Sequence, residues 1–340
     1  MLAATQTLLH PIKSGAIDVS GRRVAFLNAS MHSDMSVFAN ADLTLQQYFK
    51  PYADELVNAS LAVSTDIPND NESYDLLCIL LPKNMIEARY LMARGARLLR
   101  SGGTLICAAD NKAGGTRLKK LMMNFGFQDL YDDARNKARV IWGVANNLDK
   151  SKIEAAIDEG QECTILDGDF LSQAGVFGWD KIDKGSQILS KYIPADLKGK
   201  GADFGCGYGY LSRLVLSNCR KVKQLHCIDA DYRAVNLCEK NLVNFDVKKD
   251  FIWFDLTKPQ DNIRNLDFII MNPPFHDGKK TDISIGHNFI DQAHKALRRG
   301  GRLIMVANNH LAYENILADI FFEHSKLHEA QGFKVFCAVK

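Results

Sequence analysis

The sequence lacks paired cysteines, long apolar runs and a strong excess of either charge. Its eight cysteines are single residues without a CxxC pair, which argues against a zinc site and a disulfide framework. No stretch of about eighteen apolar residues occurs, and no charged and then apolar leader follows Met1. We therefore expect a soluble, unexported protein of the reducing cytoplasm. At a formal net charge of +2, any attraction to nucleic acid or membrane must come from a local patch.

The 340 residues exceed what one hydrophobic core normally holds, and the sequence contains an internal repeat. LLRSGGTLICAADNK at 98–112 matches ALRRGGRLIMVANNH at 296–310, including the Gly-Gly pair and the following Leu-Ile. Upstream, YDLLCILLPKN at 74–84 aligns with LDFIIMNPPFH at 266–276. In each half a helix end, a Gly-Gly turn and a buried strand follow one another, which indicates two copies of one unit.

A third pair of aligned segments indicates that each copy of the repeat is a whole domain. GRRVAFLNASM at 21–31 aligns with GKGADFGCGYG at 199–209, in the same order as the other two pairs. Strands alternate with helical stretches in both halves, which predicts two α/β domains with parallel sheets. The polar stretch at 145–165 predicts the joint, so that the domains are residues 1–145 and 160–340.

A glycine-rich turn distinguishes the second half. In GADFGCGYGYLSRLVL at 201–216, Asp203 precedes Gly205, Gly207 and Gly209, and an apolar-periodic helix follows. Alternate glycines allow positive φ angles and close approach of a ligand, and the helix start adds free N–H groups. The spacing is neither the dinucleotide fingerprint nor the phosphate loop. A turn that serves packing alone is the alternative for this motif taken by itself.

Two further strands of the second half end in acidic residues. KQLHCIDADYRAV at 223–235 reaches Asp229 about twenty residues after the glycines, where a carboxylate can accept both ribose hydroxyls. FIWFDL at 251–256 reaches Asp255, where an adenine amine could be met. Either residue alone is better explained as a turn or a strand-end cap. Three successive strand ends of this kind predict a nucleoside-binding site, because ligands of open α/β sheets bind there.

The first half lacks these features, so we interpret it as a copy that kept its fold and lost its cofactor. Bulky side chains in place of loop glycines block close backbone contact. In the alignment the glycines and the start of the Asn-Pro-Pro-Phe motif are replaced by Phe26, Leu27, Asn28, Leu80 and Leu81.

The fourth strand of the second half ends in Asn272, Pro273, Pro274 and Phe275. The prolines stop the strand and remove two backbone donors. The Asn272 side-chain oxygen and the Pro273 carbonyl become rigid acceptors for an aromatic amine, and Phe275 offers a π-face worth about 1–3 kcal/mol. A base must be flipped out of a helix to reach such a corner. The structural alternative is a proline turn without a binding role. The predicted nucleoside site beside it makes this alternative less favoured.

With these motifs, residues 165–340 resemble the class I S-adenosylmethionine-dependent methyltransferases. The strings NPPFHDG, GVFGWDKIDKGSQIL and GFKVFCAV are similar to bacterial ribosomal RNA guanine-N2 methyltransferases, which carry a degenerate N-terminal copy of the domain. Length and the LPKN stretch favour the small subunit methyltransferase C branch. The resemblance implies two tandem Rossmann-like domains, each a seven-stranded, mostly parallel sheet with helices on both faces.

The resemblance also implies a cofactor, a substrate and roles for single residues. The cofactor is S-adenosylmethionine, and the substrate is a guanine exocyclic amine in 16S ribosomal RNA, within the 30S subunit. The residues that match the family's cofactor motifs are Asp203, Gly205, Gly207, Gly209, Asp229 and Asp255. Those that would hold the amine and base are Asn272, Pro273, Pro274 and Phe275. Phe177, Gly185 and Ser186 match a segment that closes over the cofactor, although Trp179 and Lys184 depart from its usual residues.

RNA contacts are predicted from two groups of basic residues. Between Arg89 and Lys120 there are eight basic residues and one acid, and the predicted contacts among them are Arg94, Arg97 and Arg100. A solvated helix face explains this cluster equally well. Lys279 and Lys280 are better placed beside a substrate phosphate. No metal or membrane is predicted, and the oligomeric state stays open, with a monomer favoured.

Alternative functions remain open at this point. The same corner serves adenine N6 or a glutamine side chain, and the large-subunit relative differs in target rather than mechanism. A non-catalytic RNA-binding factor is the alternative from another class. The intact acidic, glycine and asparagine positions of the second half argue against it.

Overall fold

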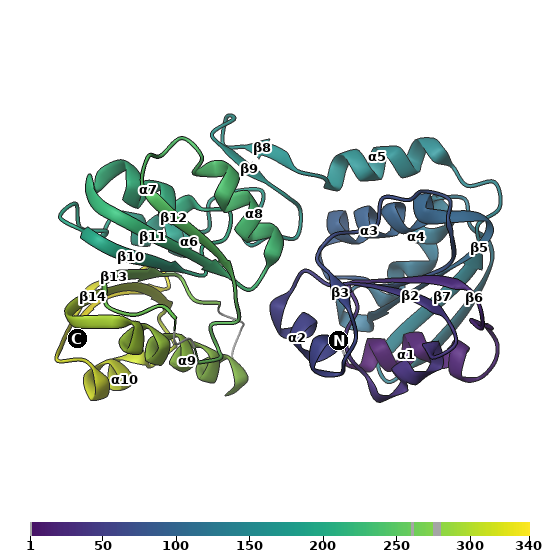
Figure 1. Cartoon of the computed structure of the whole chain (residues 1–340), viewed down its shortest axis with the longest axis horizontal. Helices are drawn as coiled ribbons and strands as arrows, with labels where there is room; N and C mark the ends of the chain where they lie inside the picture. The colour runs from purple at the N-terminus through teal and green to yellow at the C-terminus, as the bar shows by residue number, and fades with distance from the viewer. Residues whose placement is uncertain (1, 260–261, 275–279) are drawn as a thin grey trace. The chain divides into compact units, whose positions relative to one another are not determined.

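The chain folds into two compact units of the same architecture (Figure 1). The computed structural model describes residues 2–259, 262–274 and 280–340, apart from the side chains of 280–283. The first unit comprises residues 1–162 and 173–175, and the second comprises residues 163–172 and 176–340. Within the described residues, no helix is long and apolar enough to cross a membrane.

The first unit is a seven-stranded sheet with helices on both faces. Its strands are β1 (Arg23–Leu27), β2 (Asp42–Gln46), β3 (Val63–Ser64), β4 (Tyr74–Leu80), β5 (Leu99–Asp110), β6 (Gln128–Arg135) and β7 (Ala138–Val144). Its helices are α1 (Leu2–Lys13), α2 (Lys50–Asn58), α3 (Met85–Leu98), α4 (Leu118–Asn124) and α5 (Lys150–Gly160), with three short 3₁₀ turns, η1 (Ser33–Phe38), η2 (Asn111–Ala113) and η3 (Gly115–Arg117).

The second unit repeats this plan after a short hairpin of β8 (Cys163–Ile165) and β9 (Phe170–Ser172). Its sheet contains β10 (Lys198–Phe204), β11 (Lys221–Asp229), β12 (Lys248–Trp253), β13 (Leu266–Met271), β14 (Leu297–Asn308), β15 (Glu323–Ala330) and β16 (Phe333–Val339). Its helices are α6 (Lys184–Ser190), α7 (Tyr210–Asn218), α8 (Tyr232–Asn241), α9 (Lys280–Ala296) and α10 (Tyr313–Ile320).

Both sheets have the same strand order, which confirms the predicted duplication and fold class. The orders are β3-β2-β1-β4-β5-β7-β6 and β12-β11-β10-β13-β14-β16-β15. In each sheet five strands run parallel, and the last two complete the edge in antiparallel fashion. Because helices cover both faces, the central strands are continuous apolar runs, such as Phe268 to Met271.

The same polar contact, between an aspartate and an exposed arginine, recurs at the same place in the two units. Asp75 accepts a hydrogen bond from the Arg23 backbone N–H and pairs with Arg100, with 2.6 Å between Nε and Oδ1. In the second unit, Asp267 accepts from the Lys200 backbone N–H and pairs with Arg298 at 2.7 Å. The repeated pair holds the fold together, and it gives Arg100 a structural partner.

The strand registers correct the alignment of the first strands by one residue. Val24 pairs with Leu76, whereas Gly201 pairs with Phe268, the counterpart of Leu76 in the aligned segments. Phe26 therefore occupies the position of Asp203, and Asn28 that of Gly205.

The stretch expected to be a joint near 145–165 contains a helix instead. Asp149 caps α5 by accepting from the Lys152 N–H, and Ile153, Ala156 and Ile157 are buried against the first unit's core. Their three- and four-residue spacing is a short apolar stripe within a polar segment. The segment at 145–165 thus contains a helix of the first unit, and the division between the two units falls just after it, at Glu162.

Candidate active site

The glycine turn after β10 adopts a backbone that favours glycine at each alternate position. The φ angles are +80° at Gly205, +54° at Gly207 and +96° at Gly209. A Cβ atom added at Gly207 would meet no atom within 4 Å, so the turn faces open space there. The turn leads directly into α7, whose first N–H groups are free to meet a ligand.

Asp203 lies beneath this turn as a fully buried carboxylate. Its side chain is 0% exposed, its Oδ2 accepts from the Ser212 hydroxyl at 2.6 Å, and its Oδ1 has no partner among the described residues. Burial raises the pKa of Asp203 to about 7; hydrogen bonding to Ser212 opposes this rise, and the charge of the neighbouring Asp229 contributes to it. A half-satisfied buried charge of this sign fits a ligand that carries positive charge, as S-adenosylmethionine does.

This geometry predicts opposite pH dependences for stability and cofactor binding. Since the native pKa of Asp203 is about 7 and the ordinary value is 3.8, the native state holds the proton more tightly. Its contribution to the free energy of unfolding therefore falls as pH rises from about 4 to 7. Affinity for a cationic cofactor should rise over the upper part of that range, because the carboxylate ionises.

Asp203→Asn tests this expectation. The variant should be more stable than wild type at pH 8, by on the order of a few kcal/mol, and similar to it near pH 4. Its cofactor affinity should be lower at pH 8 and less dependent on pH. Thermal unfolding and calorimetric titration from pH 5.5 to 8 measure both effects; equal stability of the two proteins at pH 8 would contradict the assignment.

The acids at the next two strand ends differ in how they are held. Asp229, at the end of β11, accepts from the Gly207 and Asp231 N–H groups at 2.9 Å each, which ties it to the glycine turn. Burial raises its pKa to about 6, although these two bonds lower it. Asp255 lies two residues beyond β12, and its Oδ1 accepts from the Thr257 N–H and hydroxyl. Asp255 therefore stabilises the turn after β12, and its contact with adenine stays a prediction.

The Asn272 side chain is fixed from one side by a helix start. Its Nδ2 donates to Asp183 Oδ2 and to Ser186 Oγ, both at 2.8 Å. Asp183 also caps α6 by accepting from the Ser186 N–H at 2.9 Å. Asp183 is a residue that the sequence reasoning missed, although the pattern of Asp followed three residues later by Ser at a helix start marks a cap. Pro273 is buried and Pro274 is exposed.

These groups surround a small hollow of about 30 Å³, well below the roughly 300–1,000 Å³ that is usual for ligand sites. Five of the predicted site residues line this hollow, namely Phe177, Ser186, Gly205, Gly207 and Asn272. The predicted residues Asp203, Gly209, Asp229, Asp255 and Gly185 do not line it. Phe177 is 63% exposed at this hollow.

Gly185 and the two departing positions of its segment have packing explanations. A Cβ at Gly185 would lie 3.0 Å from Asp183 Oδ2 and 3.4 Å from Asn272 Oδ1, so glycine leaves room beside the amide. Trp179 packs against the cluster of Tyr208 and its neighbours, and Lys184 is exposed at the start of α6.

The predicted RNA contacts are only partly described. Phe275, Lys279 and the Lys280 side chain lie outside the described residues. Arg97 pairs with Glu154 at 3.3 Å, Arg94 donates to the Pro68 carbonyl, and Arg100 pairs with Asp75. These three side chains have internal partners, and their contact with RNA stays a prediction. The described residues contain no cluster suited to a metal ion.

The first unit fills the corresponding place with amides. Asn28, at the position of Gly205, has φ +54° and donates to the Leu80 carbonyl. Gln47 takes the position of Asp229, because its Oε1 accepts from the Phe49 N–H as Asp229 accepts from Asp231. The Gln47 Nε2 donates to the Ala29 carbonyl at 2.6 Å and to Asn28 Oδ1. A neutral, internally satisfied network thus replaces the carboxylates and the open turn.

The fold and the site together define a class I S-adenosylmethionine-dependent methyltransferase. The model of the methyltransferase small domain matches residues 167–337, and that of the methyltransferase small domain N-terminal region matches residues 23–157. A "Ribosomal RNA small subunit methyltransferase C" of Shewanella amazonensis is 30% identical over 273 residues, which cover 79% of each chain. The protein of the same name from Erwinia tasmaniensis is 31% identical over 78% of this chain and 76% of its own.

A solved structure shares the fold over the whole length. It is that of the T. thermophilus 16S rRNA N2 G1207 methyltransferase in complex with AdoMet and guanosine, with a TM-score of 0.81 and 23% identity, covering 99% of this chain and 91% of that one. The chain belongs to the ribosomal RNA small subunit methyltransferase C family.

Proposed function

We propose that the chain transfers a methyl group from S-adenosylmethionine to the exocyclic N2 of a guanine in 16S ribosomal RNA. The single observation that carries this proposal is the fixed Asn272 amide beside the glycine turn, whose oxygen has no hydrogen-bond donor among the described residues. Membership of the family supports the reaction, and the name of the T. thermophilus relative supports the guanine amine as its target.

The residues of the second unit would act by binding and positioning. When bound, the cofactor supplies an electrophilic methyl group on a sulfonium. Gly205, Gly207 and Gly209 would receive its methionine part, Asp229 its ribose and Asp255 its adenine edge. Asn272 Oδ1 and the Pro273 carbonyl would accept the two amine hydrogens, which draws the nitrogen lone pair out of the ring. Pro273 and Pro274 have no backbone N–H, so neither competes with the substrate for these acceptors.

The proposed substrate is an RNA within the 30S subunit, met in the cytoplasm by a monomer. Phe275 would stack on the base, and Lys279 and Lys280 would meet a nearby phosphate. In the first unit, the exposed members of the basic cluster, Lys112, Lys119 and Lys120, are better candidates for phosphate contact than its paired arginines.

Transfer of labelled methyl groups tests the proposal. The protein is incubated with labelled S-adenosylmethionine and naked 16S rRNA, 30S subunits or 50S subunits, and the modified base is identified by mass spectrometry. Label on a guanine N2 of 16S rRNA, in either form, is the expected result. Label confined to 50S subunits, to adenine or to protein would assign one of the alternative functions, and no label anywhere would reject an enzymatic role.

A further inference from the structure

The Asp183 carboxylate has a geometry that suggests more than a helix cap. Its Oδ2 accepts from two donors, the Ser186 N–H at 2.9 Å and the Asn272 Nδ2 at 2.8 Å, which come from positions 3 and 89 residues away. The Ser186 hydroxyl lies 2.8 Å from the same Nδ2. A cap needs only the first of these contacts.

The second contact determines which way the asparagine amide faces. The two ends of an amide are nearly equal in shape, but one end donates and the other accepts. An ionised carboxylate only accepts, so the Nδ2 end must face Asp183, and Oδ1 is left as the free end. The opposite orientation would place a donor where the amine hydrogens need an acceptor.

We propose that Asp183 is a positioning residue for methyl transfer, which acts by holding the Asn272 amide in its accepting orientation. This inference rests on the proposed function of Asn272. Ser186 supports the same orientation through its hydroxyl. Asp183 itself need not touch the cofactor or the base.

Two substitutions separate positioning from capping. Asp183→Asn keeps an acceptor oxygen for both donors, so kcat should stay within about threefold of wild type. Asp183→Ser keeps a capping hydroxyl, but its side chain is shorter and can also donate, so it does not hold the amide in one orientation. We expect Asp183→Ser to lower kcat by roughly 10- to 100-fold with an unchanged cofactor Kd and melting temperature. Ser186→Ala should lower kcat less.

A second readout does not depend on turnover. In ¹H–¹⁵N spectra the Asn272 side-chain amide should exchange slowly with solvent in wild type and Asp183→Asn, and rapidly in Asp183→Ser. Equal kcat and equal exchange in the Ser and Asn variants would overturn the inference. If wild type methylates no RNA, the proposed function fails, and the exchange measurement still decides whether Asp183 holds the amide.

A separate observation concerns the amino ends of the central strands in the second unit, which carry unpaired lysines. Lys198 and Lys221 are direct partners in the register of β10 and β11. The charges of Lys200 and Lys248 add to burial in lowering the pKa of His226. We call Lys198, Lys200, Lys221, Lys223 and Lys248 the basic edge; within the described ranges none of the five forms an ion pair.

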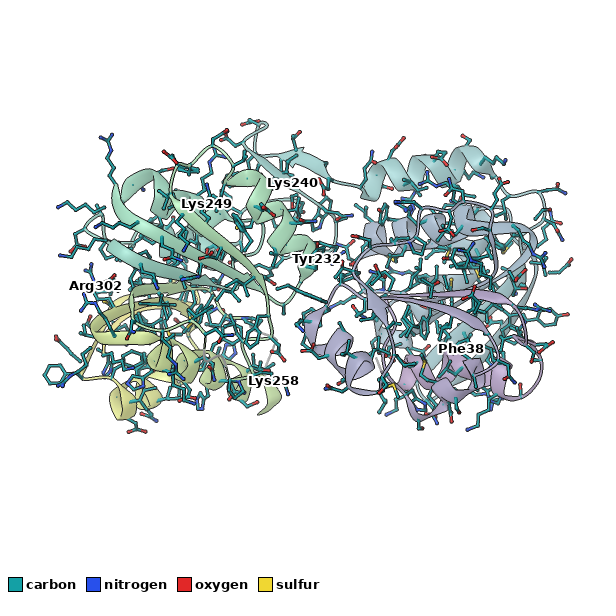
Figure 2. All side chains as sticks on the ribbon, in the orientation of Figure 1. Phe38, Tyr232, Lys240, Lys249, Lys258 and Arg302 are labelled. Carbon is teal, nitrogen blue, oxygen red and sulfur yellow. The ribbon has the colours of Figure 1, made fainter. Side chains whose placement is uncertain are left out.

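The first unit shows that the fold does not require such a cluster. Its counterpart of Lys200 is Arg23, which pairs with Asp42 and Asp70. Like charges on adjacent strands destabilise a sheet, and Asp196, Asp267 and Asp250 lie close enough to offset only part of the charge of this row. Five lysines without an ion pair in the described part of the chain therefore point to an anionic partner. The basic edge lies away from the candidate active site. Arg302 pairs with Asp196 just before β10, and Tyr232 follows the end of β11. Figure 2 shows these two residues on opposite sides of the unit.

We infer that the basic edge binds phosphates of the substrate RNA at a distance from the target base. This inference also rests on the proposed function. Flexible lysines two residues apart on one strand suit a backbone of repeated charges better than a single anion. The partner is thus a second segment of the same RNA.

Neutralising three of these lysines tests the inference. Lys198→Gln, Lys221→Gln and Lys223→Gln together should weaken binding to 16S rRNA by about tenfold or more at 0.15 M salt and reduce the slope of log K against log salt by about 2–3. The matched control replaces Lys137, Lys150 and Lys191, which are exposed elsewhere. Cofactor Kd should not change in either protein. An unchanged salt slope in the edge variant would overturn the inference even if wild type methylates the RNA.

Discussion

Asn272→Ala should lower methyl transfer to 16S rRNA by about 100- to 1000-fold and leave the cofactor Kd within about threefold of wild type. The alanine removes the side-chain acceptor that faces the hollow, and the Pro273 carbonyl alone cannot hold both amine hydrogens. Loss of one preorganised hydrogen-bonding group at a reacting centre typically has an effect of this size. Single-turnover rates at saturating cofactor, together with calorimetric titration, separate the two quantities.

Asn218→Ala is a suitable control for this prediction, because Asn218 is exposed at the end of α7. It should match wild type in both measurements. A loss of cofactor affinity in Asn272→Ala as large as that of the variant described next would mean that the amide binds the cofactor, which contradicts the division of roles.

Asp229→Ala should have the opposite signature, with a cofactor Kd raised by about 100-fold and a turnover largely restored at saturating cofactor. The carboxylate would accept charge-assisted bonds from the ribose hydroxyls, each worth about 1.5–3 kcal/mol. It also accepts from the Gly207 N–H, so its loss loosens the glycine turn. Titration calorimetry and the dependence of rate on cofactor concentration measure the effect.

Asp246→Ala removes an exposed carboxylate of the same unit and should leave the cofactor Kd unchanged. An Asp229→Ala protein that binds the cofactor as tightly as wild type would place the ribose elsewhere. A variant that binds normally and still fails to turn over would assign Asp229 to the transfer step itself.

The strand ends at the candidate site could be predicted from the sequence, because glycine and proline end a strand through their own backbone preferences. Glycines at 205, 207 and 209 have the positive φ angles that the pattern suggested, and Pro273 ends β13 directly after Asn272. The contact between Asp183 and Asn272 could not be predicted, since it joins segments 89 residues apart that only the folded sheet brings together.

Two other features could not be predicted from the local sequence pattern. The one-residue slip at Phe26 and Asn28 is visible only in the strand registers, which the order of residue types does not reveal. Helix α5 has three buried apolar residues in a polar segment, which is too little for a periodic signal without its packing partner α3. The fold class was predictable because it depends on the repeated order of strands and helices.

The amide network of the first unit limits how that unit can evolve. The Gln46 side chain accepts from the Asn28 N–H and donates to the Thr65 carbonyl, while Asn28 donates to the Leu80 carbonyl and Gln47 to the Ala29 carbonyl. Replacing any of these amides would leave a buried partner without its hydrogen bond. Regaining a nucleoside pocket would need several simultaneous reversions, each harmful alone.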